Sequence, residues 1–101
     1  MKKIINGRKY DTDTAKAIAS YSNDRPCSDF RYFYETLYQK HTKEFFLYGE
    51  GGSLSKYAEH CGQGWIGAEG IIPLTLDDAK EWVENHCSAE KYEKLFGEVA
   101  E

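Results

Sequence analysis

The order of hydrophobic and polar residues predicts strands in the first half of the chain. Two short strands are predicted over Lys2–Ile5 and Arg8–Tyr10. They are joined by Asn6-Gly7, the dipeptide most typical of a tight β-hairpin. From Phe30 to Lys40 aromatic and polar residues alternate with a period of two, and Glu44–Tyr48 follows after a polar turn. This second pair predicts an aromatic hairpin at the centre of an antiparallel sheet.

The alternation also assigns the side chains of this hairpin to two faces. Phe33, Glu35 and Leu37 fall on one face, and the opposite face carries a row of tyrosines: Tyr32, Tyr34, Tyr38 and Tyr48. A tyrosine row could stack on bases or on a protein partner. Few basic residues lie among these tyrosines, so packing within the sheet is the simpler interpretation. We expect one face to pack on helices and the other to stay partly open.

Hydrophobic residues at helical spacing predict short helices. Ala15, Ile18, Ala19 and Ser22 favour a helix over about Asp13–Tyr21, and Leu54, Tyr57 and Ala58 favour another that begins at Ser53 or Ser55 and ends near Gly62. The glycine-rich Gly62–Gly70 stretch predicts a loop. Ile71–Leu74 contains Pro73 and therefore predicts a short edge strand.

The last quarter of the chain predicts two further helices. Thr75 with Asp78 three residues later is a capping-box pattern, followed by an apolar face of Leu76, Ala79, Trp82, Val83 and His86. Ser88 is a second candidate cap, for a helix that ends near Gly97 and carries an apolar stripe of Tyr92, Leu95, Phe96 and Val99.

These elements together predict an α+β fold. An antiparallel sheet with a central aromatic hairpin would be packed on one side by three or four short helices. The 101 residues, 41% of them hydrophobic and 15% aromatic, suit a single domain over 1–101 with one core.

Features of targeting and redox state favour a cytoplasmic protein. No apolar run approaches the ~18 residues of a membrane span, and no apolar segment of a signal peptide follows Lys2 and Lys3. Three cysteines, Cys27, Cys61 and Cys87, are an odd number without paired spacing, which suits a reducing compartment.

The placement of charge is uneven. The net charge is −4, but residues 1–75 carry ten Lys or Arg against nine Asp or Glu, whereas residues 76–101 carry three Lys against eight Asp or Glu. An acidic segment repels phosphates, so we expect no direct binding of nucleic acid there. Such a face could hold a basic protein surface, or it could simply keep the protein soluble.

Candidate catalytic and ligand-binding motifs are weak. Gly49–Ser53 is glycine-rich, but it lacks the Gly-Lys-Ser/Thr ending of a phosphate loop, and turns that need positive φ angles are the simpler explanation. His60-Cys61 and His86-Cys87 lack the two-to-four-residue spacing of structural zinc ligands. Ser53, Ser55, His60 and Cys61 are close in sequence without a catalytic signature around them. We therefore expect no enzyme, no cofactor and no metal site.

Several short sequence segments, spread over nearly the whole chain, together resemble one group of proteins. They are Ile5–Ala15, Ser28–Phe30, Glu35–Tyr38, Phe46–Gly52, Ser55–Ala58, Gly70–Thr75, Ala79–Trp82 and Phe96–Glu98. The set resembles small acidic proteins of phages and mobile elements of Firmicutes, a group that includes anti-CRISPR inhibitors. Thr42-Lys43 departs from the pattern, because the hairpin turn of relatives is expected to contain a glycine there.

The resemblance implies a mechanism that the charge distribution also suits. CRISPR–Cas effectors hold DNA in basic grooves, and an acidic helical face can occupy such a groove in place of phosphates. Asp77, Glu81 and Glu84 follow one another at i, i+4 and i+7, on one side of the predicted helix. The expected partner-binding residues are Asp77, Asp78, Glu81, Glu84, Glu90 and Glu93. The alternative is a non-catalytic interaction or regulatory module of a mobile element with another protein partner.

Overall fold

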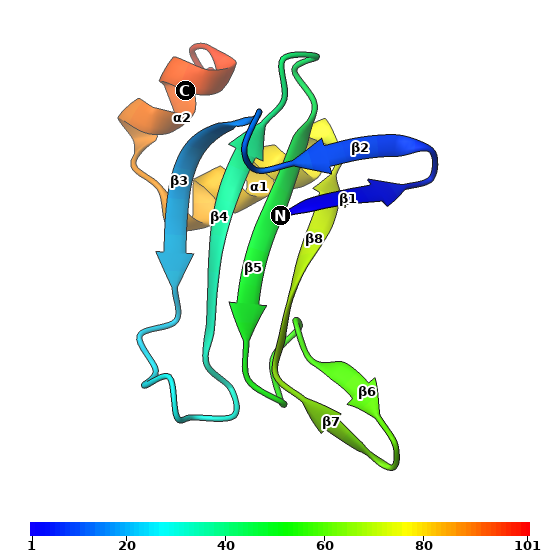
Figure 1. The fold of residues 1–101 in the computed structure, drawn as a ribbon. Helices are drawn as coiled ribbons and strands as arrows, with labels where there is room; N and C mark the ends of the chain where they lie inside the picture. The colour runs from blue at the N-terminus through cyan, green and yellow to red at the C-terminus, as the bar shows by residue number, and fades with distance from the viewer.

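A computed structural model describes all 101 residues, which form eight strands and two helices (Figure 1). The strands are β1 (Lys2–Ile5), β2 (Arg8–Asp11), β3 (Lys16–Ser22), β4 (Phe33–Gln39), β5 (Phe45–Gly51), β6 (Glu59–Cys61), β7 (Gly64–Ile66) and β8 (Ala68–Leu74). The helices are α1 (Leu76–His86) and α2 (Ala89–Phe96). The α+β class is as predicted, but there are two helices where three or four were expected.

The main sheet has four strands in the order β3-β4-β5-β8, and every neighbouring pair is antiparallel. Two separate two-stranded hairpins, β1-β2 and β6-β7, complete the strands. Helix α1 lies across one face of the sheet, while β1-β2 crosses the upper part of the opposite face and β6-β7 extends from the lower end (Figure 1). Neither helix is long and apolar enough to cross a membrane.

The larger hydrophobic core lies between the sheet and α1. Leu37, Phe45 and Leu47 from β4 and β5 pack against Ala79, Trp82 and Val83 from α1, and all six are buried. Side chains of β3 and α2 are partly buried around them. Burying one such aliphatic or aromatic side chain contributes about 1.5–3 kcal/mol, so this layer holds α1 on the sheet.

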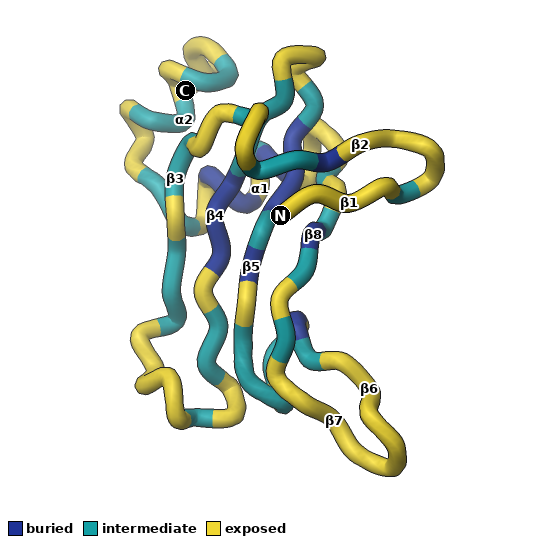
Figure 2. The backbone as a smooth tube through the Cα atoms, in the orientation of Figure 1, coloured by how far each residue is buried: buried dark blue, intermediate teal, exposed yellow.

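A smaller core lies under the β1-β2 hairpin on the opposite face. The Tyr10 ring meets Phe46 edge-on at 5.5 Å between centroids, Tyr38 stacks on Phe46 at 5.3 Å, and the Lys40 ammonium lies 3.7 Å from the centroid of the Tyr10 ring. This hairpin covers only part of the face. In β5 the buried residues are concentrated over 45–47, toward the end that the hairpin covers, whereas in β4 they lie in the middle of the strand (Figure 2).

The predicted helix over Asp13–Tyr21 is wrong, because this segment contains the edge strand β3. A β-bulge between Ala17 and Ala19 shifts the register with β4, and both Ile18 and Ala19 pack at the margin of the larger core. A bulge therefore produces the apolar spacing that resembles a helix in the sequence. Pairing with β4 is reinforced by a hydrogen bond of 2.9 Å between the hydroxyls of Ser20 and Thr36.

The predicted helix from Ser53 or Ser55 to Gly62 is also absent. Residues 53–57 form turns, in which the Ser55 hydroxyl donates to the carbonyl of Gly52 at 2.8 Å and accepts from the amide of Tyr57 at 3.2 Å. A serine that satisfies nearby backbone groups in this way favours a turn over a helix. The predicted loop over Gly62–Gly70 is wrong as well, since it contains β7 and the first residues of β8.

Both C-terminal helices begin where they were predicted to begin. The Thr75 hydroxyl accepts from the amide of Asp78 at 3.1 Å, and the Ser88 hydroxyl accepts from the amide of Lys91 at 3.1 Å. Two residues assigned to the apolar faces are nevertheless exposed. Leu76 lies in the first turn, directly after the edge strand β8, and Val99 lies beyond Gly97, where α2 ends.

Candidate functional site

The six acidic residues predicted to bind a partner are all exposed. Four of them lie on α1: Asp77, Asp78, Glu81 and Glu84. The other two, Glu90 and Glu93, lie on α2, which is separated from α1 by two residues. Since a helix rises 1.5 Å per residue, the four on α1 spread over about 10 Å of the helix axis. We call these six residues the acidic helical face.

No carboxylate of the acidic helical face forms an ion pair within the chain. The four ion pairs of the protein involve Glu35, Glu44 and Asp29 as the acidic partners. Lys80, the one lysine of α1, is half-buried, and its ammonium lies 5.9 Å from the centroid of the Phe96 ring. The negative charge of α1 is therefore available to a partner.

A buried carboxylate that was not predicted lies on the opposite side of α1, at the sheet. Glu35 of β4 is only 1% exposed and accepts hydrogen bonds from three side chains. The Tyr57 hydroxyl donates at 2.6 Å, the Trp82 indole nitrogen at 2.8 Å, and the Lys56 ammonium contacts the two carboxylate oxygens at 3.0 and 2.8 Å. We call this group the Glu35 cluster.

Electrostatics keep Glu35 ionised. Burial by itself disfavours the charge, but the hydrogen bonds from Lys56, Tyr57 and Trp82 outweigh that effect and hold the pKa of Glu35 below its ordinary value of 4.5. Burial, together with donation to this carboxylate, raises the pKa of Tyr57. A general acid needs a raised pKa, so the Glu35 cluster is arranged to hold residues 56–57 and α1 on the sheet.

His86 packs beside the same cluster at the end of α1. Its imidazole stacks on the ring of Tyr21 with 3.8 Å between centroids and meets Trp82 edge-on at 5.0 Å. Burial lowers the pKa of His86, although the charge of Glu35 acts in the opposite direction. The imidazole therefore joins edge strand β3 to α1 as a packing group.

The glycine-rich Gly49–Gly52 segment is explained by close packing. The Tyr57 ring lies directly over Gly49, where a Cβ atom would overlap it, and the cross-strand partner of Gly49 is another glycine, Gly70. A Cβ on Gly51 or Gly52 would likewise collide with neighbouring atoms. None of the three has a positive φ angle, so the expectation of positive-φ turns here is wrong. The glycines allow Tyr57 to reach Glu35.

The two His-Cys pairs lie in different parts of the fold. His60 and Cys61 lie on β6, where the imidazole contacts the Trp65 ring edge-on at 5.2 Å, whereas His86 and Cys87 lie at the end of α1. No three His, Cys, Asp or Glu side chains come together in a group that could hold a metal ion. Ser55 is one of the two serines considered as a nucleophile, and its hydroxyl forms the two turn hydrogen bonds described above.

The tyrosines predicted to lie on one face divide between two environments. Tyr38 and Tyr48 are both half-buried against the smaller core, whereas Tyr34 is exposed toward the uncovered end of the same face. The Tyr48 hydroxyl donates to a carboxylate oxygen of Glu69 on β8 at 2.6 Å, and this bond raises the pKa of Tyr48 to about 12. Glu50 of β5 and Glu69 were not predicted as site residues.

The residues missed from the sequence share one property, because each depends on partners that are distant in the chain. The contacts of Glu35 span 21 to 47 residues, and Tyr48 and Glu69 are 21 residues apart. The available signal was an acidic residue on the same face of the predicted strand as Phe33 and Leu37, the face expected to pack on helices. No protein-family model matches the chain, and none of the curated proteins and none of the solved structures matches it.

Proposed function

We propose that the protein is a non-catalytic inhibitor of the anti-CRISPR type. The acidic helical face would bind a basic, DNA-binding surface of a CRISPR–Cas effector and prevent target DNA from binding. The observation that carries this proposal is the set of six exposed carboxylates on α1 and α2, none of which has a basic partner within the chain. The protein would act in the cytoplasm of a bacterial host that carries a phage or another mobile element.

The spacing of the charges supports imitation of a nucleic-acid backbone. Asp77, Glu81 and Glu84 extend over about 10.5 Å along the α1 axis, since the helix rises 1.5 Å per residue. A DNA strand carries about one negative charge per 3.4 Å, and therefore about three over the same distance. A groove that holds a phosphate backbone with lysines and arginines would meet a similar density of negative charge on this helix.

The rigidity of α1 supports the same proposal. Thr75 caps the helix, Ala79, Trp82 and Val83 are buried on its other side, and the Trp82 indole is hydrogen-bonded to Glu35. The carboxylates thus project from a helix that is fixed on the sheet before a partner binds. A preorganised charged surface loses less conformational entropy on binding than a mobile one.

A charge-reversal experiment on a reconstituted effector tests the proposal. Changing Asp77, Glu81 and Glu84 together to Lys should reduce inhibition of target DNA binding by about a hundredfold or more, because repulsion replaces attraction at three positions. The parent protein should compete with target DNA without binding DNA itself. Its inhibition should weaken as salt is added, since exposed charges are screened over about 8 Å at physiological ionic strength.

A matched control distinguishes the effect of the acidic helical face from the effect of the net charge of the protein. Asp13, Asp24 and Glu59 are also exposed, form no ion pair and lie outside the helices. Changing all three to Lys therefore alters the net charge by the same amount. This control variant should inhibit like the parent protein. Equal inhibition by both triple variants would exclude the acidic helical face as the contact surface. The remaining function would then be an interaction module that binds through another face.

A further inference from the structure

The face of the sheet opposite α1 is only partly covered. The β1-β2 hairpin packs over Phe46 and Ile71, toward one end of this face. Beyond it, Tyr34, Glu50 and Glu69 form one row across β4, β5 and β8, and Tyr48 belongs to the next row. Tyr34, Glu50 and Glu69 are exposed and Tyr48 is half-buried beside the smaller core. We call these four side chains the open sheet face, and neither the helices nor the β1-β2 hairpin cross the lower end of the sheet on this side (Figure 1).

Two carboxylates of the open sheet face are directly opposite each other without a cation. Glu50 and Glu69 are register partners on adjacent antiparallel strands, a position where like charges destabilise a sheet. Tyr48 donates a hydrogen bond to Glu69, but no Lys or Arg forms an ion pair with either residue. The sheet therefore carries an unfavourable charge pair that a bound cation would relieve.

A hollow of about 410 Å³ lies beside this pair. Both carboxylates line it, together with Cys27, Tyr32 and the backbone of residues 51–52 and 67–68. The glycines make part of its floor out of backbone, and the chain approaches itself so closely there that a Cβ on Gly67 would be 2.6 Å from the carbonyl oxygen of Gly51. The lining of the hollow thus includes two glutamates and a tyrosine, whose side-chain oxygens can accept hydrogen bonds from a donor.

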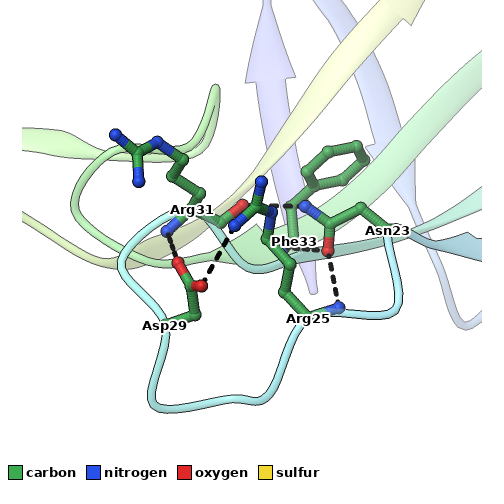
Figure 3. A network of polar contacts seen from close by, with 5 residues as sticks. All are labelled: Asn23, Arg25, Asp29, Arg31 and Phe33. Atoms are coloured by element: carbon green, nitrogen blue, oxygen red, sulfur yellow. Dashed lines mark hydrogen bonds and ion pairs between the residues drawn. The ribbon is translucent and has the colours of Figure 1, made fainter.

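The loop that supplies Cys27 and Tyr32 is held by a network of polar contacts (Figure 3). The Asn23 side chain donates to the carbonyl of Arg31 at 2.8 Å and accepts from the amide of Phe33 at 3.3 Å. Asp29 accepts from the amide of Arg31 at 2.8 Å and pairs with the Arg25 guanidinium at 3.1 Å. The backbone hydrogen bond from Arg31 lowers the pKa of Asp29, so this network stays charged at neutral pH. The wall of the hollow is therefore formed in the free protein.

We propose that the hollow and the open sheet face bind an arginine side chain from a protein segment. A guanidinium donates through five N–H groups in one plane, so it can contact Glu50 and Glu69 together. Its plane can also stack on a tyrosine such as Tyr34. The net negative charge of this face excludes a nucleic-acid backbone as its occupant. This contact is separate from the acidic helical face, because α1 packs on the other side of the sheet.

The experiment measures binding of a defined peptide by amide chemical shifts. The probe is a capped twelve-residue peptide of alternating arginine and glycine, and a second peptide carries citrulline, which has the same shape but no charge, in place of every arginine. Titration with the arginine peptide should shift the amides of Tyr34, Tyr48, Glu50, Gly51 and Glu69. The citrulline peptide should bind at least about tenfold more weakly, since the charge-assisted hydrogen bonds are lost.

Two double variants locate the contact. Glu50→Gln with Glu69→Gln should weaken binding of the arginine peptide at least about tenfold, and it should not lower the melting temperature because it removes a like-charge pair. Asp13→Asn with Glu59→Gln removes the same charge from exposed positions outside both the open sheet face and the acidic helical face, and should change the affinity less than about twofold. Shifts confined to α1 and α2, equal binding of the citrulline peptide, or equal losses in the two variants would each overturn the proposal. Inhibition of an effector by the acidic helical face is read out separately and does not depend on this result.

Discussion

Replacing Glu35 with Gln removes one charge from the interior with almost no change in shape. In the folded protein the carboxylate accepts from Lys56, Tyr57 and Trp82, at distances between 2.6 and 3.0 Å. A glutamine offers one acceptor oxygen and one NH₂ group. The oxygen can still accept from Trp82 or Tyr57, but the NH₂ group must then face other donors. At least one hydrogen bond is lost, and the Lys56 ammonium loses its counter-ion.

The expected loss of stability follows from burial and from the exposure of the lysine. Removing one partner of a buried ion pair costs about 3–5 kcal/mol when the remaining charge stays buried. The Lys56 side chain is 43% exposed and can be hydrated, so the cost should be lower, about 2–3 kcal/mol. For a chain of this size that corresponds to a fall in melting temperature of roughly 10 °C.

The pH dependence gives a second, independent measure. Because the pKa of Glu35 is lowered in the folded state, its ionisation stabilises the fold fully above the unfolded value of 4.5 and progressively less as the pH falls through the folded pKa. The parent should therefore lose part of its advantage over Glu35→Gln below pH 4.5. Urea unfolding of both proteins at pH 7 and pH 3 measures this change.

A matched surface variant shows whether burial is the cause. Glu44 is half-exposed and contacts Arg8, Lys40 and Thr42, so Glu44→Gln also removes a carboxylate with several partners. Exposed ion pairs contribute little to stability because water screens them, so this variant should unfold at nearly the same urea concentration as the parent. If Glu35→Gln unfolds at the same urea concentration as Glu44→Gln, or if its difference from the parent is the same at both pH values, the Glu35 cluster does not stabilise the fold as argued.

Three further changes test other parts of the structure. Lys43 has a φ of 75° in the β4-β5 turn, so Lys43→Gly should stabilise the protein by about 0.5–1 kcal/mol, and an unchanged or lower melting temperature would contradict this. Gly49→Ala should destabilise it by at least about 2 kcal/mol in urea unfolding, since the new methyl group overlaps the Tyr57 ring, whereas Gly64→Ala, with open space around it, should cost much less. Purified protein should contain no stoichiometric metal by elemental analysis and should melt at the same temperature in chelator, because no three candidate ligands cluster.

Local signals predicted the ends of the chain better than its middle. Asn6-Gly7 specifies the β1-β2 hairpin through its positive φ angles, and Thr75 and Ser88 specify the start of each helix through a side-chain hydrogen bond. Such features need only neighbouring residues. The spacing of Ile18 and Ala19 was ambiguous, because a bulged strand and a helix both place adjacent apolar residues near one face, and pairing with β4 decides between them.

The candidate surfaces differ in the same way. The acidic helical face could be named from the sequence because helical periodicity alone places Asp77, Glu81 and Glu84 together. Glu50 and Glu69 could not be paired from the sequence, since their opposition depends on the register between β5 and β8, with the β6-β7 hairpin inserted between them. A charged residue such as Glu35 at a position that faces the core conflicts with the hydrophobic pattern of its strand. Its hydrogen-bond partners become known only with the tertiary structure.

The chain separation of the contacts around Glu35 has a consequence for the kinetics of folding. Strands β3, β4 and β5 are consecutive in the sequence and adjacent in the sheet, so their pairing closes only short loops. Trp82 reaches Glu35 across 47 residues, so this hydrogen bond requires α1 to be docked on the sheet. If these hydrogen bonds form after the rate-limiting step, Glu35→Gln will leave the refolding rate almost unchanged and accelerate unfolding. The hydrogen bonds of the buried carboxylate would then chiefly slow unfolding and so set the lifetime of the native state.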